Sequence, residues 1–249
     1  WSYKDVRGQL GNAALIAVGV DVGALKNLTI HNDFDIITTR DDFSYQKLSM
    51  ALSCPVVPSV DVAFGMNIKK ENCERKGIGV CYCAKYANPS VMARVLDELI
   101  AKTGKRVELI PMSYERDRRV ADRIKAAVEV PFDWAGSLQV KKLMKNDVEV
   151  KPLPKIIDEA TSRVQHYETI ISMRLHVGYI AALCKVPFVM CPLEPARKLK
   201  SASMLCMGAD TVQSLVANFE IRPVDENLLN EQIRRDEVNH VAVRKAKTK

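Results

Sequence analysis

Short apolar runs alternate with longer stretches of mixed polarity along most of the chain. Short runs rich in valine and isoleucine are typical of buried strands, and apolar residues three or four positions apart are typical of helices. The pattern predicts strands over residues 13–22, 35–40, 54–62, 78–83, 106–111, 130–134, 148–153, 169–172 and 187–190. It predicts helices over residues 43–52, 88–103, 114–128, 137–144, 154–166, 174–183 and 226–244, and a further helix in the basic segment that follows Met190. This alternation favours an α/β fold with parallel sheets covered by helices on both faces.

A polar and charged stretch from Asn67 to Lys76 interrupts the alternation. We interpret it as a linker between two Rossmann-like α/β units. The first unit covers residues 1–70, and the second is a C-terminal α/β domain with a C-terminal helix, over residues 71–249. The glycines near the first predicted strand do not form a GxGxxG pattern, so no dinucleotide cofactor is expected.

The candidate site lies where the predicted strand Thr169–Ser172 ends and Arg174 and His176 begin the next helix. In an open α/β sheet, ligands bind beyond the carboxyl ends of the strands, and the N–H groups of a helix start suit an anion. Structural roles are the alternative. Arg174 would then tie the helix start to Asp158 or Glu159, and His176 would pack in the core under the sheet.

The composition narrows the class of protein. The chain has 249 residues and a formal net charge of +7, with a dense basic end at residues 244–249. This charge fits either a solvated surface or an anionic partner such as nucleic acid, a phosphorylated substrate or a membrane surface. Few aromatic residues lie near basic ones, which gives a single-strand nucleic-acid platform only weak support. No apolar run is long enough to span a membrane and no signal segment opens the chain, so we expect a cytoplasmic protein.

The seven cysteines form no CxxC pair, and the chain has only four histidines. Zinc sites in sequence are usually recognised from closely spaced pairs of such ligands, so we expect no metal site. Most of the cysteines lie inside apolar runs and are interpreted as reduced, buried thiols in a reducing compartment.

Several short segments carry a family resemblance. In chain order they are Thr39–Ser44, Val60–Phe64, Ser172–His176, Ala181–Leu183, Val186–Val189, Glu194–Pro195 and Lys198. Their order and approximate spacing over residues 13–210 resemble the polysaccharide pyruvyl transferase family. The resemblance implies a fold similar to the two-domain GT-B glycosyltransferases. It also implies an enzyme that moves the enolpyruvyl group of phosphoenolpyruvate to a sugar, forming a pyruvate ketal.

The resemblance also implies roles for individual residues. Arg174 would bind the anionic donor, because a guanidinium can hold a phosphate or carboxylate through two parallel hydrogen bonds. His176 would carry protons in acid–base catalysis. The substrate-binding candidates are Arg40, Arg197 and Lys198 for anions and Glu194 for a sugar or ribose hydroxyl. Arg40 has an alternative role in a local salt bridge with Asp41, and Asp61 is better explained as the end of a strand than as a catalytic group.

The chain departs from the family at its beginning, where the glycine-rich opening of the N-terminal domain is missing. The first residue is Trp1, and the N-terminal unit is expected to be truncated or to be completed by another chain. These departures keep two other functions open. One is a catalytically inactive GT-B-like domain that binds an anionic or protein partner. The other is a glycosyltransferase that uses a sugar nucleotide. The net charge of +7 and the missing N-terminal portion favour the inactive binding domain, whereas the placement of Arg174 and His176 favours the pyruvyl transferase.

Overall fold

The protein consists of two compact α/β units. The computed structural model describes residues 14–22, 34–112, 132–194, 197–217 and 219–247. The first unit comprises Trp1–Asn67 together with Asn227–Lys249, and the second comprises Ile68–Glu226. Among the described helices, none combines the length and the apolar composition needed to cross a lipid bilayer.

The second unit is built on a parallel sheet with the strand order β6-β5-β4-β7-β8-β9. Its strands are β4 (Ile78–Cys81), β5 (Val107–Leu109), β6 (Glu149–Val150), β7 (Thr169–Ser172), β8 (Phe188–Met190) and β9 (Met207–Gly208). The chain starts at β4, moves outward to β6, and then returns to β7 on the other side of β4. The direction of winding therefore reverses between β4 and β7, where Cys81 lies opposite Ser172.

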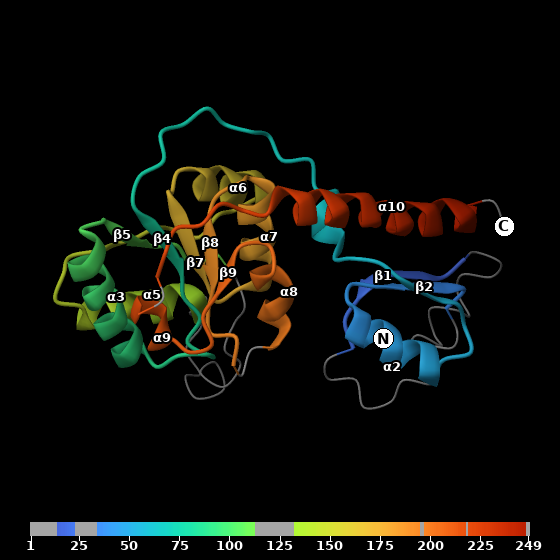
Figure 1. Ribbon diagram of the computed structural model, residues 1–249, viewed down its shortest axis with the longest axis horizontal. Coiled ribbons are helices and arrows are strands. Elements are labelled where there is room, and N and C mark those ends of the chain that lie inside the picture. The colour runs from blue at the N-terminus through green and yellow to red at the C-terminus, as the bar shows by residue number, and fades with distance from the viewer. Residues whose placement is uncertain (1–13, 23–33, 113–131, 195–196, 218, 248–249) are drawn as a thin grey trace, which may run out of the picture. The chain divides into compact units, whose positions relative to one another are not determined.

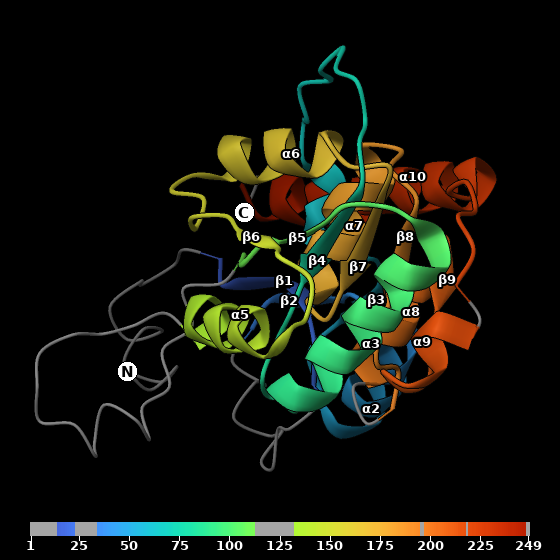
Figure 2. The ribbon, with the colours of Figure 1, turned by 90° about the vertical axis from the view of Figure 1, so that its left-hand side faces the viewer.

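Helices cover both faces of this sheet (Figures 1 and 2). The helices on one face are α3 (Pro89–Thr103), α5 (Phe132–Leu143) and α9 (Ser214–Ala217). Those on the other face are α6 (Ile157–Gln165), α7 (Leu175–Leu183) and α8 (Lys200–Ser203), which the 3-10 turn η3 (Arg197–Leu199) precedes. This is the predicted α/β architecture with a parallel sheet between two helical layers.

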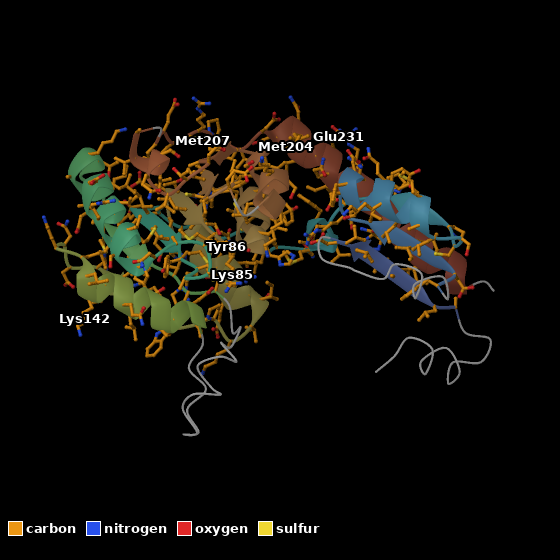
Figure 3. The ribbon with its side chains drawn as sticks, turned by 90° about the horizontal axis from the view of Figure 1, so that it is seen from below. Lys85, Tyr86, Lys142, Met204, Met207 and Glu231 are labelled. Atoms are coloured by element: carbon orange, nitrogen blue, oxygen red, sulfur yellow. The ribbon has the colours of Figure 1, made fainter. Side chains whose placement is uncertain are left out.

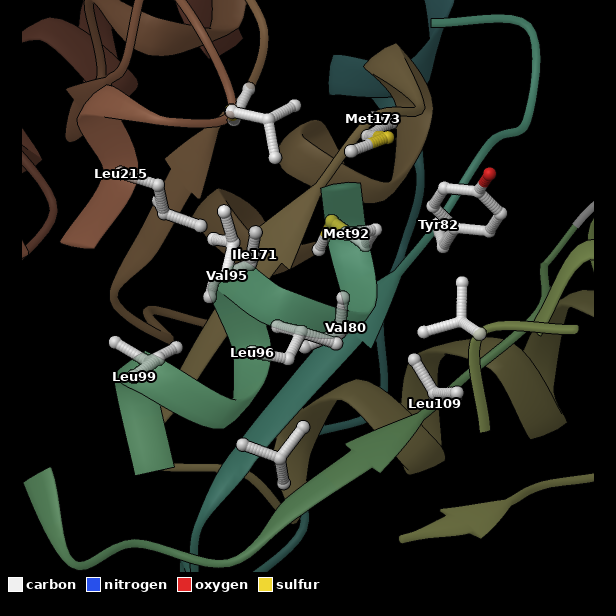
Figure 4. Packing of buried hydrophobic residues seen from close by; sticks show 14 of the residues in the cluster. Val80, Tyr82, Met92, Val95, Leu96, Leu99, Leu109, Ile171, Met173 and Leu215 are labelled. Atoms are coloured by element: carbon white, nitrogen blue, oxygen red, sulfur yellow. The ribbon is translucent and has the colours of Figure 1, made fainter. Parts of the chain in front are cut away.

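Helix α3 is the best example of a helix specified by local sequence. Asn88 caps its start by accepting a hydrogen bond from Ser90 N at 2.8 Å, and Pro89 occupies the first turn. Gly104 ends it with a positive φ of 65°, which glycine adopts without a steric penalty. The apolar stripe that includes Leu96 and Leu99 is completely buried (Figure 4). This stripe packs against strand residues such as Val80, so helix and sheet share one core.

The first unit contains a smaller parallel sheet, β1-β2-β3. Its described elements are β1 (Ile16–Val20), β2 (Ile36–Thr39), α2 (Asp42–Ala51), β3 (Val56–Pro58), the 3-10 turn η2 (Val62–Gly65) and α10 (Glu226–Lys247). Asp41 caps α2 by accepting from Ser44 N at 2.7 Å, as expected for an Asp before a helix.

Most of helix α10 belongs to the first unit, whereas the sequence analysis assigned the C-terminal helix to the second domain. Asn239 donates to Val60 O at 3.1 Å and also accepts a hydrogen bond from Thr38. Ser59 Oγ donates to Arg235 O at 3.3 Å. These contacts join residues 176 to 201 positions apart, and nothing in the local pattern of a charged helix indicates which unit it will cover.

Three further elements differ from the sequence-based expectation. The predicted strand over 130–134 is wrong, because α5 begins at Phe132 and the backbone is helical through Trp134. Strand β9 and helix α9 were not predicted; both are too short for a clear periodic pattern. The predicted helix over 114–128 lies outside the described residues.

Candidate functional site

The candidate site is formed at the carboxyl ends of β4, β7 and β8. Ser172 ends β7, and its hydroxyl accepts a hydrogen bond from Arg174 N at 3.0 Å and donates one to Arg174 O at 2.8 Å. These two bonds form a tight turn that places Arg174 at the N-cap of α7. Since the winding reverses between β4 and β7, this turn lies at the switch point where doubly wound sheets bind their ligands.

Arg174 is anchored by a buried ion pair with Asp133. Its Nε donates to Asp133 Oδ2 at 3.1 Å, and its Nη2 donates to Asp133 Oδ1 at 2.5 Å. The Asp133 side chain is fully buried, and 17% of the Arg174 side chain is exposed. Two parallel bonds to a planar guanidinium set its orientation as well as its position. A carboxylate therefore holds Arg174, as the structural alternative predicted. The partner is Asp133 on α5, however, rather than Asp158 or Glu159.

The interior next to this ion pair is poorly solvated. Burial raises the pKa of the Cys81 thiol well above its ordinary value, and the nearby Asp133 carboxylate raises it further while Arg174 opposes the effect. Burial also raises the pKa of Tyr82, whose hydroxyl donates to Ala87 O at 2.6 Å. These groups stay neutral near neutral pH, so the charges of Arg174 and Asp133 dominate the local field.

His176 lies in the first turn of α7 and is exposed. This excludes the alternative of a core histidine packed under the sheet. Its ring centre lies 6.2 Å from that of Tyr179, with the planes tilted by 53°. The Tyr179 hydroxyl lies 2.8 Å from Ser201 Oγ, which fixes the tyrosine between α7 and α8. His176 is thus accessible to solvent and lies near a tyrosine that is hydrogen-bonded to α8.

A cavity of about 230 Å³ opens at the same end of the sheet. Its walls come from the loop after β4, the start of α3, and the loops after β8 and β9. The lining residues include Tyr86, Asn88, Pro192, Glu194 and Gln213. Lys85 precedes Tyr86, and its ammonium lies 5.9 Å from the centre of the Tyr86 ring (Figure 3). The polar and aromatic lining suits a polar ligand with a hydrophobic face, such as a sugar.

The predicted substrate-binding residues lie in different environments. Glu194 lines the cavity and accepts a hydrogen bond from Lys200 Nζ at 2.8 Å. Lys198 is exposed on η3, and the structure describes the backbone of Arg197 but not its side chain. These three residues follow β8, as the sequence indicated, and their contacts with a ligand stay predictions.

Arg40 belongs to the first unit, at the carboxyl end of β2. It pairs with Asp21 and lies 3.5 Å from Asp41 and 3.7 Å from Asp61. Asp61 is buried and accepts a hydrogen bond from Ala63 N at 3.0 Å, which begins η2. Three carboxylates around one guanidinium support the structural alternatives for Arg40 and Asp61.

Asp133 is the site residue that the sequence analysis did not identify. It is separated from Arg174 by 41 positions and lies in a segment that was interpreted as a strand. One sequence signal could have indicated it, since Asp133 lies between Phe132 and Trp134. A carboxylate that is buried with such apolar neighbours needs a charged or hydrogen-bonding partner.

Comparison with known proteins identifies the family. The model of the polysaccharide pyruvyl transferase family matches residues 24–194, more than half of the chain. The chain belongs to the polysaccharide pyruvyl transferase family. The matched part of this family member includes Arg40, Asp133, Arg174, His176 and Glu194, whereas Arg197 and Lys198 lie beyond it. The sequence comparison with curated proteins gives no match.

Solved structures similar to this pyruvyl transferase family member have GT-B folds, as expected. TarM matches with a TM-score of 0.52 at 10% identity, over 100% of this chain and 50% of TarM. The Gap123 glycosylation-associated complex of Streptococcus agalactiae matches with a TM-score of 0.51 at 12% identity, over 97% of this chain and 50% of that chain. The UDP-GlcNAc 2-epimerase of Methanocaldococcus jannaschii matches with a TM-score of 0.51 at 12% identity, over 86% and 62% of the two chains. The chain thus spans about half of the length of the first two structures.

Proposed function

We propose that the protein is a pyruvyl transferase that moves the enolpyruvyl group of phosphoenolpyruvate onto a sugar of a polysaccharide or glycan precursor. The observation that carries this proposal is the position of His176. It is an exposed proton carrier in the first turn of α7, next to the anchored Arg174 and at the switch point of the sheet. Family membership supports the same reaction class.

The start of α7 suits the anionic donor. The first N–H groups of a helix have no partner within the helix, and they carry a partial positive charge. The Arg174 side chain makes no capping hydrogen bond to them. A phosphate or carboxylate of the donor would accept from these N–H groups, with Arg174 held beside it by Asp133. Asp133 fixes the orientation of Arg174, and in this proposal the N–H groups that the guanidinium does not use for Asp133 would contact the donor.

The reaction adds one proton to a carbon of the donor and removes one proton from each of two sugar hydroxyls. The donor methylene gains a proton, two sugar hydroxyls bond to the adjacent carbon and lose theirs, and inorganic phosphate leaves. In our proposal His176 transfers a proton in this sequence, and Glu194 holds a sugar hydroxyl in the 230 Å³ cavity.

The test is the His176→Gln variant, measured by phosphate release from phosphoenolpyruvate with a panel of glycan acceptors. We expect the rate to fall by about 100-fold or more, because general acid–base catalysis contributes factors of this size. We expect phosphoenolpyruvate to raise the melting temperature of the wild-type chain. The same rise should persist in His176→Gln, since the helix N–H groups remain. The matched control is His240→Gln, an exposed histidine in the first unit, which should leave both readouts unchanged.

Two outcomes would contradict the proposal. If phosphoenolpyruvate gives neither turnover nor a thermal shift, but a UDP-sugar gives both, the protein is a sugar-nucleotide glycosyltransferase. The similarity of its fold to TarM and the cavity lined by Glu194 favour this as the second candidate. If neither donor acts and a protein or nucleic-acid ligand binds instead, the domain is a non-catalytic binding module.

A further inference from the structure

A group of potential metal ligands lies away from the candidate site, where the segment before β4 passes the end of α6. Glu71 and Cys73 come from that segment, and His166 follows the last residue of α6. One ligand atom from each side chain lies within 4.8 Å of the others. Glu71 and His166 are exposed and Cys73 is partly buried, so an ion can reach all three.

Gln165 fixes the backbone on which Glu71 and Cys73 stand. It is 3% exposed, and its side-chain oxygen accepts from Glu71 N at 2.9 Å while its amide nitrogen donates to Lys69 O at 3.1 Å. The Cys73 thiol lies 3.4 Å from Gln165 O. A buried amide thus holds both sides of this turn against α6, and the ligand residues are preorganised rather than carried on a free loop.

Ser162 orients the side chains of His166 and Glu71. Its carbonyl oxygen lies 2.8 Å from His166 Nδ1, and because a carbonyl only accepts, Nδ1 carries the proton. The lone pair is then on Nε2, the atom available to a metal. The Ser162 hydroxyl also donates to Glu71 Oε2 at 3.1 Å. A histidine whose second nitrogen donates to a backbone carbonyl is the usual arrangement of metal-bound histidines.

We propose that Glu71, Cys73 and His166 form a site for a divalent transition metal, with zinc as the ion that the ligands suit best. Thiolate, imidazole and carboxylate are the three protein ligands of zinc. Tetrahedral bond lengths place such ligand atoms roughly 3.5 Å apart, so a small side-chain rotation closes the described cluster around an ion. Three protein ligands leave the fourth position to water. Cys73 and the neighbouring Gln165 are 92 positions apart in sequence. A metal ion at this site would therefore tie the segment before β4 to the end of α6.

The site is tested with the metal-free chain and Zn²⁺ or Co²⁺ alone. We expect one equivalent of Zn²⁺ to bind in calorimetry, and Co²⁺ to give a thiolate charge-transfer absorption band. Cys73→Ser should abolish that band and weaken Zn²⁺ binding by about 100-fold or more. Losing even a residue that only hydrogen-bonds to a metal ligand lowers the affinity by about 10–100-fold, and a ligand itself should matter more. Ser162→Ala keeps all three ligands and should weaken binding by about tenfold.

Cys54→Ser is the matched control, because Cys54 is another partly buried thiol and lies in the first unit. It should leave the Co²⁺ spectrum and the Zn²⁺ affinity unchanged. The proposal is overturned if the wild-type chain gives no thiolate band. It is also overturned if Cys73→Ser and Cys54→Ser bind Zn²⁺ with equal affinity.

Discussion

Replacing Asp133 with asparagine is expected to lower the free energy of unfolding of the second unit by about 3–5 kcal/mol. The side chain of Asp133 is fully buried and accepts two hydrogen bonds from Arg174. The substitution leaves the guanidinium charge in a poorly solvated place without its counterion, and this uncompensated charge is the main cost. Urea or guanidinium unfolding, followed by circular dichroism, measures the change.

A double-mutant cycle separates the ion pair from general packing. Arg174→Met alone should also destabilise, because it leaves Asp133 unpaired, but the Asp133→Asn, Arg174→Met double variant should lose much less than the sum. Asp147→Asn is the control, since Asp147 is 94% exposed and should change stability by less than about 0.5 kcal/mol. A small effect of Asp133→Asn, or strict additivity in the cycle, would show that Asp133 does not anchor Arg174.

Gly77→Ala is expected to destabilise the second unit by about 3 kcal/mol, from the combined costs of a left-handed backbone and an overpacked contact. Gly77 has a φ of 67°, and a Cβ added there would lie 2.5 Å from Arg106 O. That oxygen cannot retreat easily, because it accepts from Ile78 N at 2.8 Å. Glu168 holds Gly77 on both sides, because its side chain accepts from Gly77 N at 3.0 Å and its backbone N donates to Gly77 O at 3.1 Å.

Gly104→Ala separates the two costs. Gly104 has nearly the same φ, 65°, but a Cβ there meets nothing within 4 Å. The left-handed strain is then the only new term, and it is partly offset because alanine restricts the unfolded chain, so we expect a loss of about 1 kcal/mol. Equal losses for the two variants would mean that the contact with Arg106 O relaxes without cost.

Much of the fold was predictable, because its signals are local. The periodicity of α3, with Asn88 and Gly104 at its ends, depends on residues close together in sequence. The same is true of the strand Thr169–Ser172, whose observed bounds match the prediction. The segment over 130–134 was misinterpreted because Phe132 and Trp134 favour strands in isolation. Tertiary contacts override that preference: α5 packs against α3, and a Cβ at Gly136 would lie 2.9 Å from Tyr82.

The sequence by itself determined the alternation of strands and helices, the family, and the position of Arg174 and His176 at a strand end. These features depend on residue types at short spacing, so they can be recognised without knowing which distant segments come into contact. Only the tertiary structure decided that Asp133 holds Arg174, that α10 covers the first unit, and that Glu71, Cys73 and His166 meet. Each of these arrangements brings together segments at least 41 positions apart, and the packing of buried surfaces, rather than any local preference, selects such partners.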